Sequence, residues 1–175
     1  MTIRFVFAAT LAALLTIPLA AQVQKQDMPG IRNYSRVDAT VGCGGAVDPS
    51  AMAALRQEGF VSVVNLRLAS EQGANVEEGR AAAQTAGLKY IHLPFSGGSP
   101  DPTVVERFLA TVADPSNQPV FIHCGSANRV GAVWMIKRAL QDEWPVEKAL
   151  VEAQAIGLRS EGLTAFATEY INTHE

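Results

Sequence analysis

The sequence predicts an α/β fold with a mostly parallel central sheet and helices on both faces. Short runs rich in β-branched residues alternate with longer segments whose apolar residues recur at helical spacing. Glycine and proline separate most of these segments, as expected between elements of regular structure. Alternating strands and helices are typical of a parallel sheet that helices cover on two sides. In such a fold, ligands bind beyond the carboxyl ends of the strands.

Helix boundaries in the first half of the chain are indicated by capping patterns. Asp48 followed by Pro49 is typical of a helix start, and Gly59 of a helix end. Asn75 with Glu78 resembles a capping box. The elements predicted here are one or two short strands over 31–41, a helix over 49–58, a strand over 61–66, a helix from 75 to 87 and a strand over 89–94.

The second half begins with a loop of turn-forming residues over 95–101, and Asp101 with Pro102 then starts a helix. A short apolar strand follows at 120–122. The next helix places its apolar residues on one side and Lys137 and Arg138 on other faces. Two further helices are predicted, one beginning at Pro145 and one over about 163–170.

Residues 1–21 are predicted to be a secretory signal peptide. Arg4 supplies its basic end, an apolar run extends over 5–19, and a polar stretch follows. The run is shorter than the ~20 residues of a membrane span, although an uncleaved anchor is the alternative. We therefore expect a periplasmic or secreted protein that is not stably inserted in a membrane after cleavage. Residues 22–30 are predicted to be a flexible leader and residues 31–175 a single domain.

The charge of the chain argues against some classes of partner. The formal net charge is −3, and it becomes −4 when the leader with Arg4 is removed. A mildly acidic surface gives no support for binding to nucleic acid or to anionic membranes. The spacing of cysteines and histidines does not resemble a metal site, and no organic cofactor is implied.

Cys124 and Arg129 delimit the stretch that carries the predicted chemistry. Cys124 stands where a strand ends, and Arg129 stands where a helix begins. Unpaired N–H groups at a helix N-terminus stabilise a thiolate and bind tetrahedral anions, and a guanidinium can hold two oxygens of such an anion. The residues between them are small enough for the backbone to curl around an anion: Gly125, Ser126, Ala127 and Asn128. This arrangement predicts nucleophilic attack on phosphorus or sulfur.

The stretch HCGSANRVGAVW resembles the signature loop of cysteine-dependent phosphatases, in which His-Cys is followed by five residues, Arg, and Ser or Thr. It is most similar to the bacterial beta-lactamase-hydrolase-like, phosphatase-like domain, which has a shortened loop and a tryptophan in the next helix, as at Trp134. The resemblance continues upstream through VDATVGCGGAVDPSAMAALRQEGFVSVVNLR. It implies a phosphatase-like three-layer fold and a phosphorylated substrate. Cys124 would attack a phosphomonoester, Arg129 and the loop amides would hold its oxygens, and water would hydrolyse the phosphocysteine.

The sequence departs from the larger phosphatase superfamily in two ways. Only four residues separate Cys124 from Arg129, and Val130 stands where the superfamily has a hydroxyl that helps the thiolate leave. Ser126 is a candidate to supply that hydroxyl. The four-residue spacing also occurs in rhodanese-like sulfurtransferases, so a persulfide carrier on Cys124 is one alternative. A non-catalytic oxyanion-binding module is another.

Other residues are candidates for supporting roles. His123 is predicted to lie on the strand face opposite Cys124 and to orient the loop through hydrogen bonds. In related phosphatases an aspartate in the loop after the preceding strand protonates the leaving oxygen, and Asp101 is the only carboxylate in the matching loop. Its alternative role is a helix N-cap. Arg67 either widens a positive rim or pairs with Glu71.

Cys43 is the only other cysteine and lies among glycines. In the resembling family this glycine-rich segment runs close to the signature loop. An exported protein meets an oxidising compartment. One hypothesis is therefore that Cys43 and Cys124 pair reversibly and so protect the nucleophile. The alternative is that Cys43 is a small buried residue.

Overall fold

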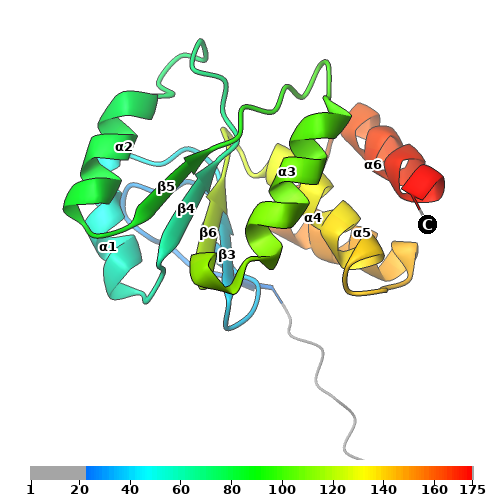
Figure 1. Cartoon of the computed structure of the whole chain (residues 1–175), viewed down its shortest axis with the longest axis horizontal. Helices are drawn as coiled ribbons and strands as arrows, with labels where there is room; N and C mark the ends of the chain where they lie inside the picture. Colours follow the sequence, from blue (N-terminus) through cyan, green and yellow to red (C-terminus); the bar gives the residue numbers. More distant parts are fainter. Residues whose placement is uncertain (1–22, 175) are drawn as a thin grey trace, which may run out of the picture.

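The computed structural model describes residues 23–174 and contains a six-stranded sheet between two groups of helices (Figure 1). The predicted signal peptide lies outside the described residues. No helix in the described part is both long and apolar enough to cross a membrane. The strands are β1 (Gln24–Lys25), β2 (Ser35–Arg36), β3 (Val41–Gly44), β4 (Ser62–Asn65), β5 (Lys89–His92) and β6 (Val120–His123). The helices are α1 (Met52–Gln57), α2 (Val76–Thr85), α3 (Pro102–Ala113), α4 (Asn128–Leu140), α5 (Val146–Ile156) and α6 (Glu161–His174), with short 3-10 helices at Pro49–Ala51 and Pro115–Asn117.

The sheet has the strand order β1-β2-β3-β6-β4-β5, and its four larger strands run parallel. Strand β6 lies between β3 and β4, so that Ile122 is opposite Cys43 on one side and Val64 on the other. The small strands β1 and β2 add to β3 in antiparallel fashion. The predicted α/β class with a mostly parallel sheet is therefore confirmed.

The two faces of the sheet bury separate cores. Val120 and Ile122 point into a core shared with α3, α4, α5 and α6, whereas Phe121 packs into a second core with α1 and α2. Figure 1 shows the two helix groups on opposite sides of the strands. Helix α4 is the most deeply buried, because the sheet lies on one side of it and α5 and α6 on the others. The predicted three-layer arrangement with helices on both faces is present.

Two residues of the segment predicted to be a flexible leader, Gln24 and Lys25, form an edge strand of the sheet. Residues 24–25 form β1, and the amide of Gln26 donates to the carbonyl of Tyr34 at 3.2 Å. Lys25 Nζ donates to the carbonyl of Ile156 at 2.8 Å, at the C-terminus of α5, where a cation is favourable. The prediction was wrong because an edge strand pairs through its backbone, which a polar composition does not reveal.

Of the predicted capping patterns, one is confirmed and two are not. Asp101 Oδ1 accepts from the amide of Thr103 at 2.9 Å and caps α3. Asn75 adopts a left-handed conformation with φ of 46°, and its side chain makes no cap hydrogen bond, so the predicted capping box does not form. Asp48 makes no side-chain cap bond either. These two helix starts are therefore fixed by backbone conformation and packing.

Arg138 lies in the interior, although the sequence placed it away from the apolar side of its helix. Its exposed fraction is 8%, and its guanidinium lies between the rings of Trp134 and Trp144, at 4.8 and 4.4 Å from their centroids. Arg138 Nε donates to Glu152 Oε1 at 2.7 Å, and Nη2 donates to Asp38 Oδ2 at 3.1 Å. The arginine thereby links α4, α5 and the turn between β2 and β3.

Candidate active site

Cys124 lies in the six-residue stretch 124–129, which we call the nucleophile loop, between the end of β6 and the first turn of α4. Its side chain is buried and faces the core under α4. The neighbouring strands β3 and β4 run parallel to β6, so the segments that follow their carboxyl ends meet beside this loop. The placement of Cys124 and Arg129 at a strand end and a helix start agrees with the prediction.

The nucleophile loop is tied back through its carbonyl groups. The carbonyl of Gly125 accepts from the amide of Ala46 at 3.0 Å, and that of Ser126 accepts from Asn33 Nδ2 at 3.2 Å. Within residues 23–174 no hydrogen bond engages the amides of Gly125 and Ser126. The amides of the first turn of α4 are likewise free of intrahelical partners. The loop therefore offers unpaired N–H groups to an anion.

Two close backbone contacts fix the shape of this loop. A Cβ added at Gly45 would lie 3.1 Å from the carbonyl oxygen of Gly125 and 3.1 Å from the Cα of Ser126, so only glycine fits there comfortably. Ala127 is fully buried with φ of 71°, a left-handed conformation that costs an alanine about 1–2 kcal/mol. Its methyl group packs on Gly157, where an added Cβ would come within 2.9 Å. The fold thus holds the loop in a strained shape from two sides.

Arg129 is anchored by groups from two other loops. Its Nη1 donates to the carbonyl of Phe95 at 3.0 Å and, more weakly, to that of Leu66 at 3.3 Å. Nη1 and Nη2 also donate to the two carboxylate oxygens of Glu71, the second at 2.8 Å. Burial alone would lower the pKa of Arg129, but Glu71 and the nearby Cys124 sulfur raise it, so the side chain stays charged.

The bidentate pair with Glu71 uses the Nη1–Nη2 edge of the Arg129 guanidinium and leaves the Nε–Nη2 edge available. Among the residues that the structure describes, no hydrogen bond engages Arg129 Nε, and Nη2 donates only to Glu71. The Nε and Nη2 hydrogens on that edge are parallel and match two oxygens of a phosphate. Arg129 is therefore held rigidly with a two-donor edge free for an oxyanion.

Glu71 is the main site residue that the sequence did not assign to Arg129. Its carboxylate also accepts from the amide of Leu68 at 2.8 Å and from Arg67 Nε at 3.2 Å. Arg67 donates further to the carbonyl of Gln72 at 2.7 Å, which curls the loop after β4 around the carboxylate. The predicted Arg67–Glu71 pair is confirmed, and Arg67 is not a free positive rim. Glu71 could have been recognised from its position after the end of β4, a strand adjacent to β6. The carboxyl ends of parallel strands meet at one edge of the sheet, so an acidic residue there lies near the nucleophile loop.

We expect the contribution of Glu71 to stability to disappear in acid. Its hydrogen bonds with Arg129 hold the pKa of Glu71 at about 2, below the ordinary value of ~4.3. Because this pKa is lower in the folded protein than in the unfolded chain, the ionised carboxylate stabilises the fold above pH ~4.3. This stabilisation is lost as the pH falls towards 2. The difference in thermal midpoint between the wild type and Glu71→Gln should therefore be full at pH 7 and fall to about half at pH 3.

The matched control for this experiment is Glu77→Gln. Glu77 pairs with Arg80, but its side chain is 83% exposed. Such surface pairs contribute about 0–1 kcal/mol, so its midpoint should follow that of the wild type at each pH. A Glu71→Gln difference that stays constant from pH 7 to pH 3 would contradict the role given to Glu71.

His123 occupies the predicted face but does not make the predicted hydrogen bonds. Its ring stacks on Phe121 at 6.2 Å, on the side of the sheet opposite Cys124. Burial lowers the pKa of His123 to about 4, and nearby backbone groups of Cys124 and Gly45 offset this only in part, so the ring is neutral near pH 7. Neither ring nitrogen has a hydrogen-bond partner of acceptable geometry within residues 23–174. His123 therefore supports the loop by packing.

The remaining candidates differ in their exposure and in their hydrogen bonds. Ser126 is exposed, and no hydrogen bond joins its hydroxyl to Cys124 in the described part of the chain. Asn128 Oδ1 accepts from the amides of Arg159 and Ser160 at 2.9 and 3.2 Å, so this side chain anchors the loop to the segment before α6. Asp101 is exposed and serves as the cap of α3.

Cys43 and Cys124 are both free and buried, so the predicted pairing is absent. Cys43 is opposite Ile122, two residues before Cys124 on the adjacent strand. This offset separates the two Cα atoms by roughly 8 Å, and a disulfide requires less than ~7 Å. Burial raises the pKa of Cys43 well above its usual range, so its thiol stays protonated. Cys43 is a small core residue, as the alternative interpretation had it.

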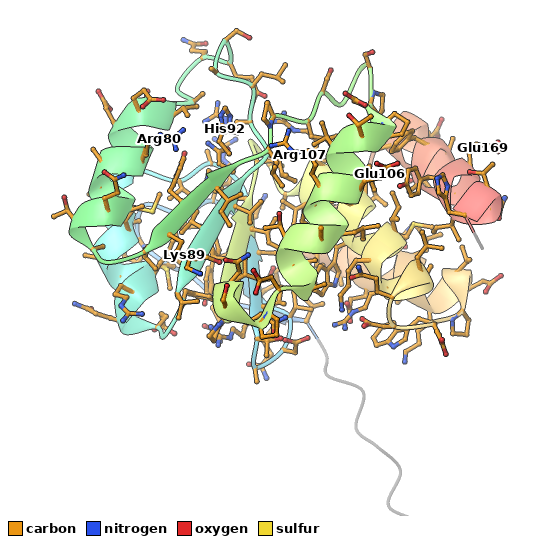
Figure 2. The ribbon with its side chains drawn as sticks, viewed as in Figure 1. Arg80, Lys89, His92, Glu106, Arg107 and Glu169 are labelled. Carbon is orange, nitrogen blue, oxygen red and sulfur yellow. The ribbon has the colours of Figure 1, made fainter. Side chains whose placement is uncertain are left out.

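His92 is a further side chain near the site, and its role is structural. His92, at the end of β5 in Figure 2, places Nε2 at 2.8 Å from the carbonyl of Arg67 and is a satisfied histidine. Within residues 23–174 no group of three or more His, Cys, Asp or Glu side chains is arranged to hold a metal ion.

The family assignment follows from the sequence together with this site. The family described as beta-lactamase hydrolase-like protein, phosphatase-like domain, matches residues 34–141, which is more than half of the chain. The chain belongs to this family. The matched region of the phosphatase-like domain includes Glu71, Cys124 and Arg129. No curated protein matches the sequence.

Solved structures of phosphatases share the fold of this phosphatase-like domain. A DUF442 putative phosphatase from Shewanella putrefaciens CN-32 has a TM-score of 0.72 at 22% identity, over 83% of this chain and 95% of that chain. TpbA from P. aeruginosa has a TM-score of 0.67 at 23% identity, over 91% and 94%. The core catalytic domain of the PP-IP phosphatase SIW14 from S. cerevisiae, in complex with citrate, has a TM-score of 0.64 at 20% identity, over 82% and 86%. At these identities the likeness establishes the fold.

Proposed function

We propose that this protein is a cysteine-dependent phosphatase that hydrolyses phosphomonoesters through a phosphocysteine intermediate. The observation that carries the proposal is the nucleophile loop, where a buried cysteine precedes unpaired amides and the free two-donor edge of Arg129. These donors match the equatorial oxygens of a phosphoryl group and the charge that develops on them in the transition state. Membership in a phosphatase-like family supports the same assignment.

The proposed reaction has two steps. The Cys124 thiolate attacks phosphorus, an S–P bond forms, and the P–O bond to the leaving group breaks. Water then attacks phosphorus, the S–P bond breaks, and phosphate and the thiolate are released. Arg129 and the loop amides hold the phosphoryl oxygens through both steps.

Asp101 is the proposed proton donor for the leaving oxygen in the first step. The loop that ends at Asp101 starts at Phe95, whose carbonyl accepts from Arg129. A Cβ added at Gly97, in the same loop, would lie 3.8 Å from Arg129 Cγ, so the loop packs against the aliphatic part of the Arg129 side chain. Only one oxygen of Asp101 is used in capping α3.

A tyrosine-type or dual-specificity preference is part of the proposal, and the neighbour TpbA has been crystallised with pTyr as a variant.

The test is a phosphatase assay on the mature protein beside Cys124→Ser. We expect hydrolysis of nitrophenyl phosphate by the wild type and loss of at least about 10³-fold in the variant, because serine lacks the nucleophilic thiolate. Equal rates would refute the enzymatic assignment. In the same assay Asp101→Asn should slow hydrolysis of an alkyl phosphate more than that of nitrophenyl phosphate, whose leaving group needs no proton.

One observation supports a second candidate function. The four-residue spacing between Cys124 and Arg129 is that of rhodanese-like sulfurtransferases, which carry a persulfide on the cysteine. Transfer of sulfur from thiosulfate to cyanide at a rate well above phosphate release would establish this alternative. Phosphate binding without turnover of any ester would indicate the anion-binding module instead.

A further inference from the structure

The loop that carries Glu71 leaves strand β4 directly after a buried asparagine. Asn65 is the last residue of β4 and has an exposed fraction of 0%, and Arg67, two residues later, is 6% exposed. A buried polar side chain costs free energy unless its groups are hydrogen-bonded. The partners of Asn65 therefore indicate what this residue does in the fold.

Both ends of the Asn65 side chain are hydrogen-bonded. Its Oδ1 accepts from the backbone amide of Arg67 at 2.8 Å, and its Nδ2 donates to the hydroxyl of Tyr90 on β5 at 2.8 Å. A backbone amide can only donate, so the oxygen must face Arg67 and the nitrogen must face Tyr90. A Cβ added at Gly79, inside α2, would lie 3.2 Å from the Tyr90 hydroxyl oxygen. Glycine destabilises a helix interior relative to alanine, and here it gives this hydroxyl the space to reach Asn65.

Arg67 in turn fixes the loop that carries Glu71. The carbonyl of Arg67 accepts from Nε2 of His92, which Figure 2 shows at the end of β5, at 2.8 Å. The guanidinium donates to the carboxylate of Glu71 and to the carbonyls of Gln72 and Gly73. Surface loops are ordinarily more mobile than the elements they connect, but this loop is held by a buried side chain whose backbone is bonded to the sheet. The position of the sheet is thereby passed on to Glu71.

We propose that Asn65 is a positioning residue, which fixes the carboxylate of Glu71 through Arg67. Because both oxygens of that carboxylate accept from Arg129, the same contacts set the direction of the free Nε–Nη2 edge. This inference rests on the proposed function, in which that edge binds the phosphoryl group. Without the Asn65 side chain, the amide of Arg67 loses its partner and the bidentate pair loosens. A displacement of about 1 Å at a reaction centre can cost about 10²-fold in rate.

The experiment follows the titration of Glu71 itself, by carbon-13 NMR of its carboxyl group. Hydrogen bonds from Arg129 hold the pKa of Glu71 at about 2 in the wild type. We expect Asn65→Ala to raise this pKa towards the ordinary value of ~4.3, because the pair with Arg129 loosens. A general loss of stability would leave the pKa in the folded protein unchanged, so the titration separates positioning from a merely structural role.

The matched control is Ser62→Ala, which removes another polar side chain of β4 with an exposed fraction of 0%. Ser62 lies at the opposite end of the strand, where its hydroxyl donates to the carbonyl of Asn117. This variant should leave the pKa of Glu71 at about 2.

Activity provides a second measurement. We expect Asn65→Ala to lower kcat/KM for nitrophenyl phosphate about tenfold or more. Asn65→Ser, whose hydroxyl can accept from the amide two residues later, should have an activity between those of the wild type and Asn65→Ala. In a Glu71→Ala background, Asn65→Ala should cost little further activity, because the group through which Asn65 acts is absent.

Two results would overturn the inference: a pKa of Glu71 that stays at about 2 in Asn65→Ala, or equal losses of activity with and without the Glu71 carboxylate. If Asn65→Ala does not fold, the same titration is made on Tyr90→Phe, which removes only the partner of Nδ2 and should raise the pKa in the same direction.

The titration also separates this inference from the proposed function, because it needs no turnover. If nitrophenyl phosphate is not hydrolysed but Asn65→Ala raises the pKa of Glu71, the phosphatase assignment fails and the positioning of Glu71 by Asn65 stands. If nitrophenyl phosphate is hydrolysed and the pKa does not change, the phosphatase assignment stands and the role of Asn65 is refuted.

Discussion

Replacing Arg129 with lysine should lower kcat/KM for nitrophenyl phosphate by about 10³-fold. Lysine is a single point donor and cannot bind Glu71 and a phosphoryl group through two separate edges, as the guanidinium can. The change also removes the contacts to the carbonyls of Leu66 and Phe95, which fix the loops after β4 and β5 against the nucleophile loop. The expected loss therefore exceeds that of removing one hydrogen-bond donor.

Three measurements make this prediction specific. Arg80→Lys, the same substitution on the exposed face of α2, should retain full activity. Arg129→Ala should regain part of its activity when free guanidinium ion is added, and should gain nothing from an alkylammonium ion of similar size. Circular dichroism should show that the variants are folded. A loss of less than about tenfold in Arg129→Lys would mean that the two-donor edge is not used in the transition state.

Replacing Arg138 with methionine should destabilise the protein by about 3–5 kcal/mol, the largest effect expected on stability. Glu152 is 7% exposed, and its Oε1 accepts from Arg138 Nε at 2.7 Å and from Trp134 Nε1 at 2.6 Å. Without the arginine, a buried carboxylate keeps only the indole N–H as a donor. Asp142 Oδ2 also loses a bond of 2.8 Å. Urea unfolding monitored by tryptophan fluorescence measures the change.

A double-mutant cycle tests whether the uncompensated charge is the cause. Glu152→Gln removes that charge and keeps an oxygen for Trp134. The double variant Arg138→Met with Glu152→Gln should therefore be more stable than Arg138→Met alone. Arg80→Met, which breaks an exposed pair, should change stability by less than about 1 kcal/mol. A double variant that is as unstable as the sum of the two single changes would indicate that lost packing dominates.

The sequence was sufficient for the frame of the molecule because the frame depends on local patterns. The β-branched runs at 61–66 and 120–122 correspond to β4 and β6, and the helical apolar spacing after Val130 corresponds to α4. The pairing of Cys124 and Arg129 was likewise readable, since both flank one short loop between a strand and a helix. Such features follow from periodicity and from the order of elements along the chain.

The parts that sequence reasoning missed depend on contacts between distant segments. Glu71 meets Arg129 across 58 positions, and Arg138 meets Asp38 across 100. Neither pair leaves a periodic signal, and each charged residue taken alone resembles an ordinary surface residue. The strand at Gln24–Lys25 was missed for a related reason, because it is held by backbone pairing with β2 and by one contact of Lys25 with α5. Only the folded arrangement shows these partners.

The two-residue offset between Cys43 and Cys124 has a consequence for oxidative damage. A thiolate that reacts with peroxide becomes a sulfenic acid, which a second thiol within reach can rescue by forming a disulfide. Cys43 is the only other cysteine in the chain, but it lies too far along its strand and stays protonated in the core. Oxidised Cys124 therefore has no resolving thiol of its own. Its return to the active form depends on a reductant from another molecule, before further oxidation makes the damage permanent.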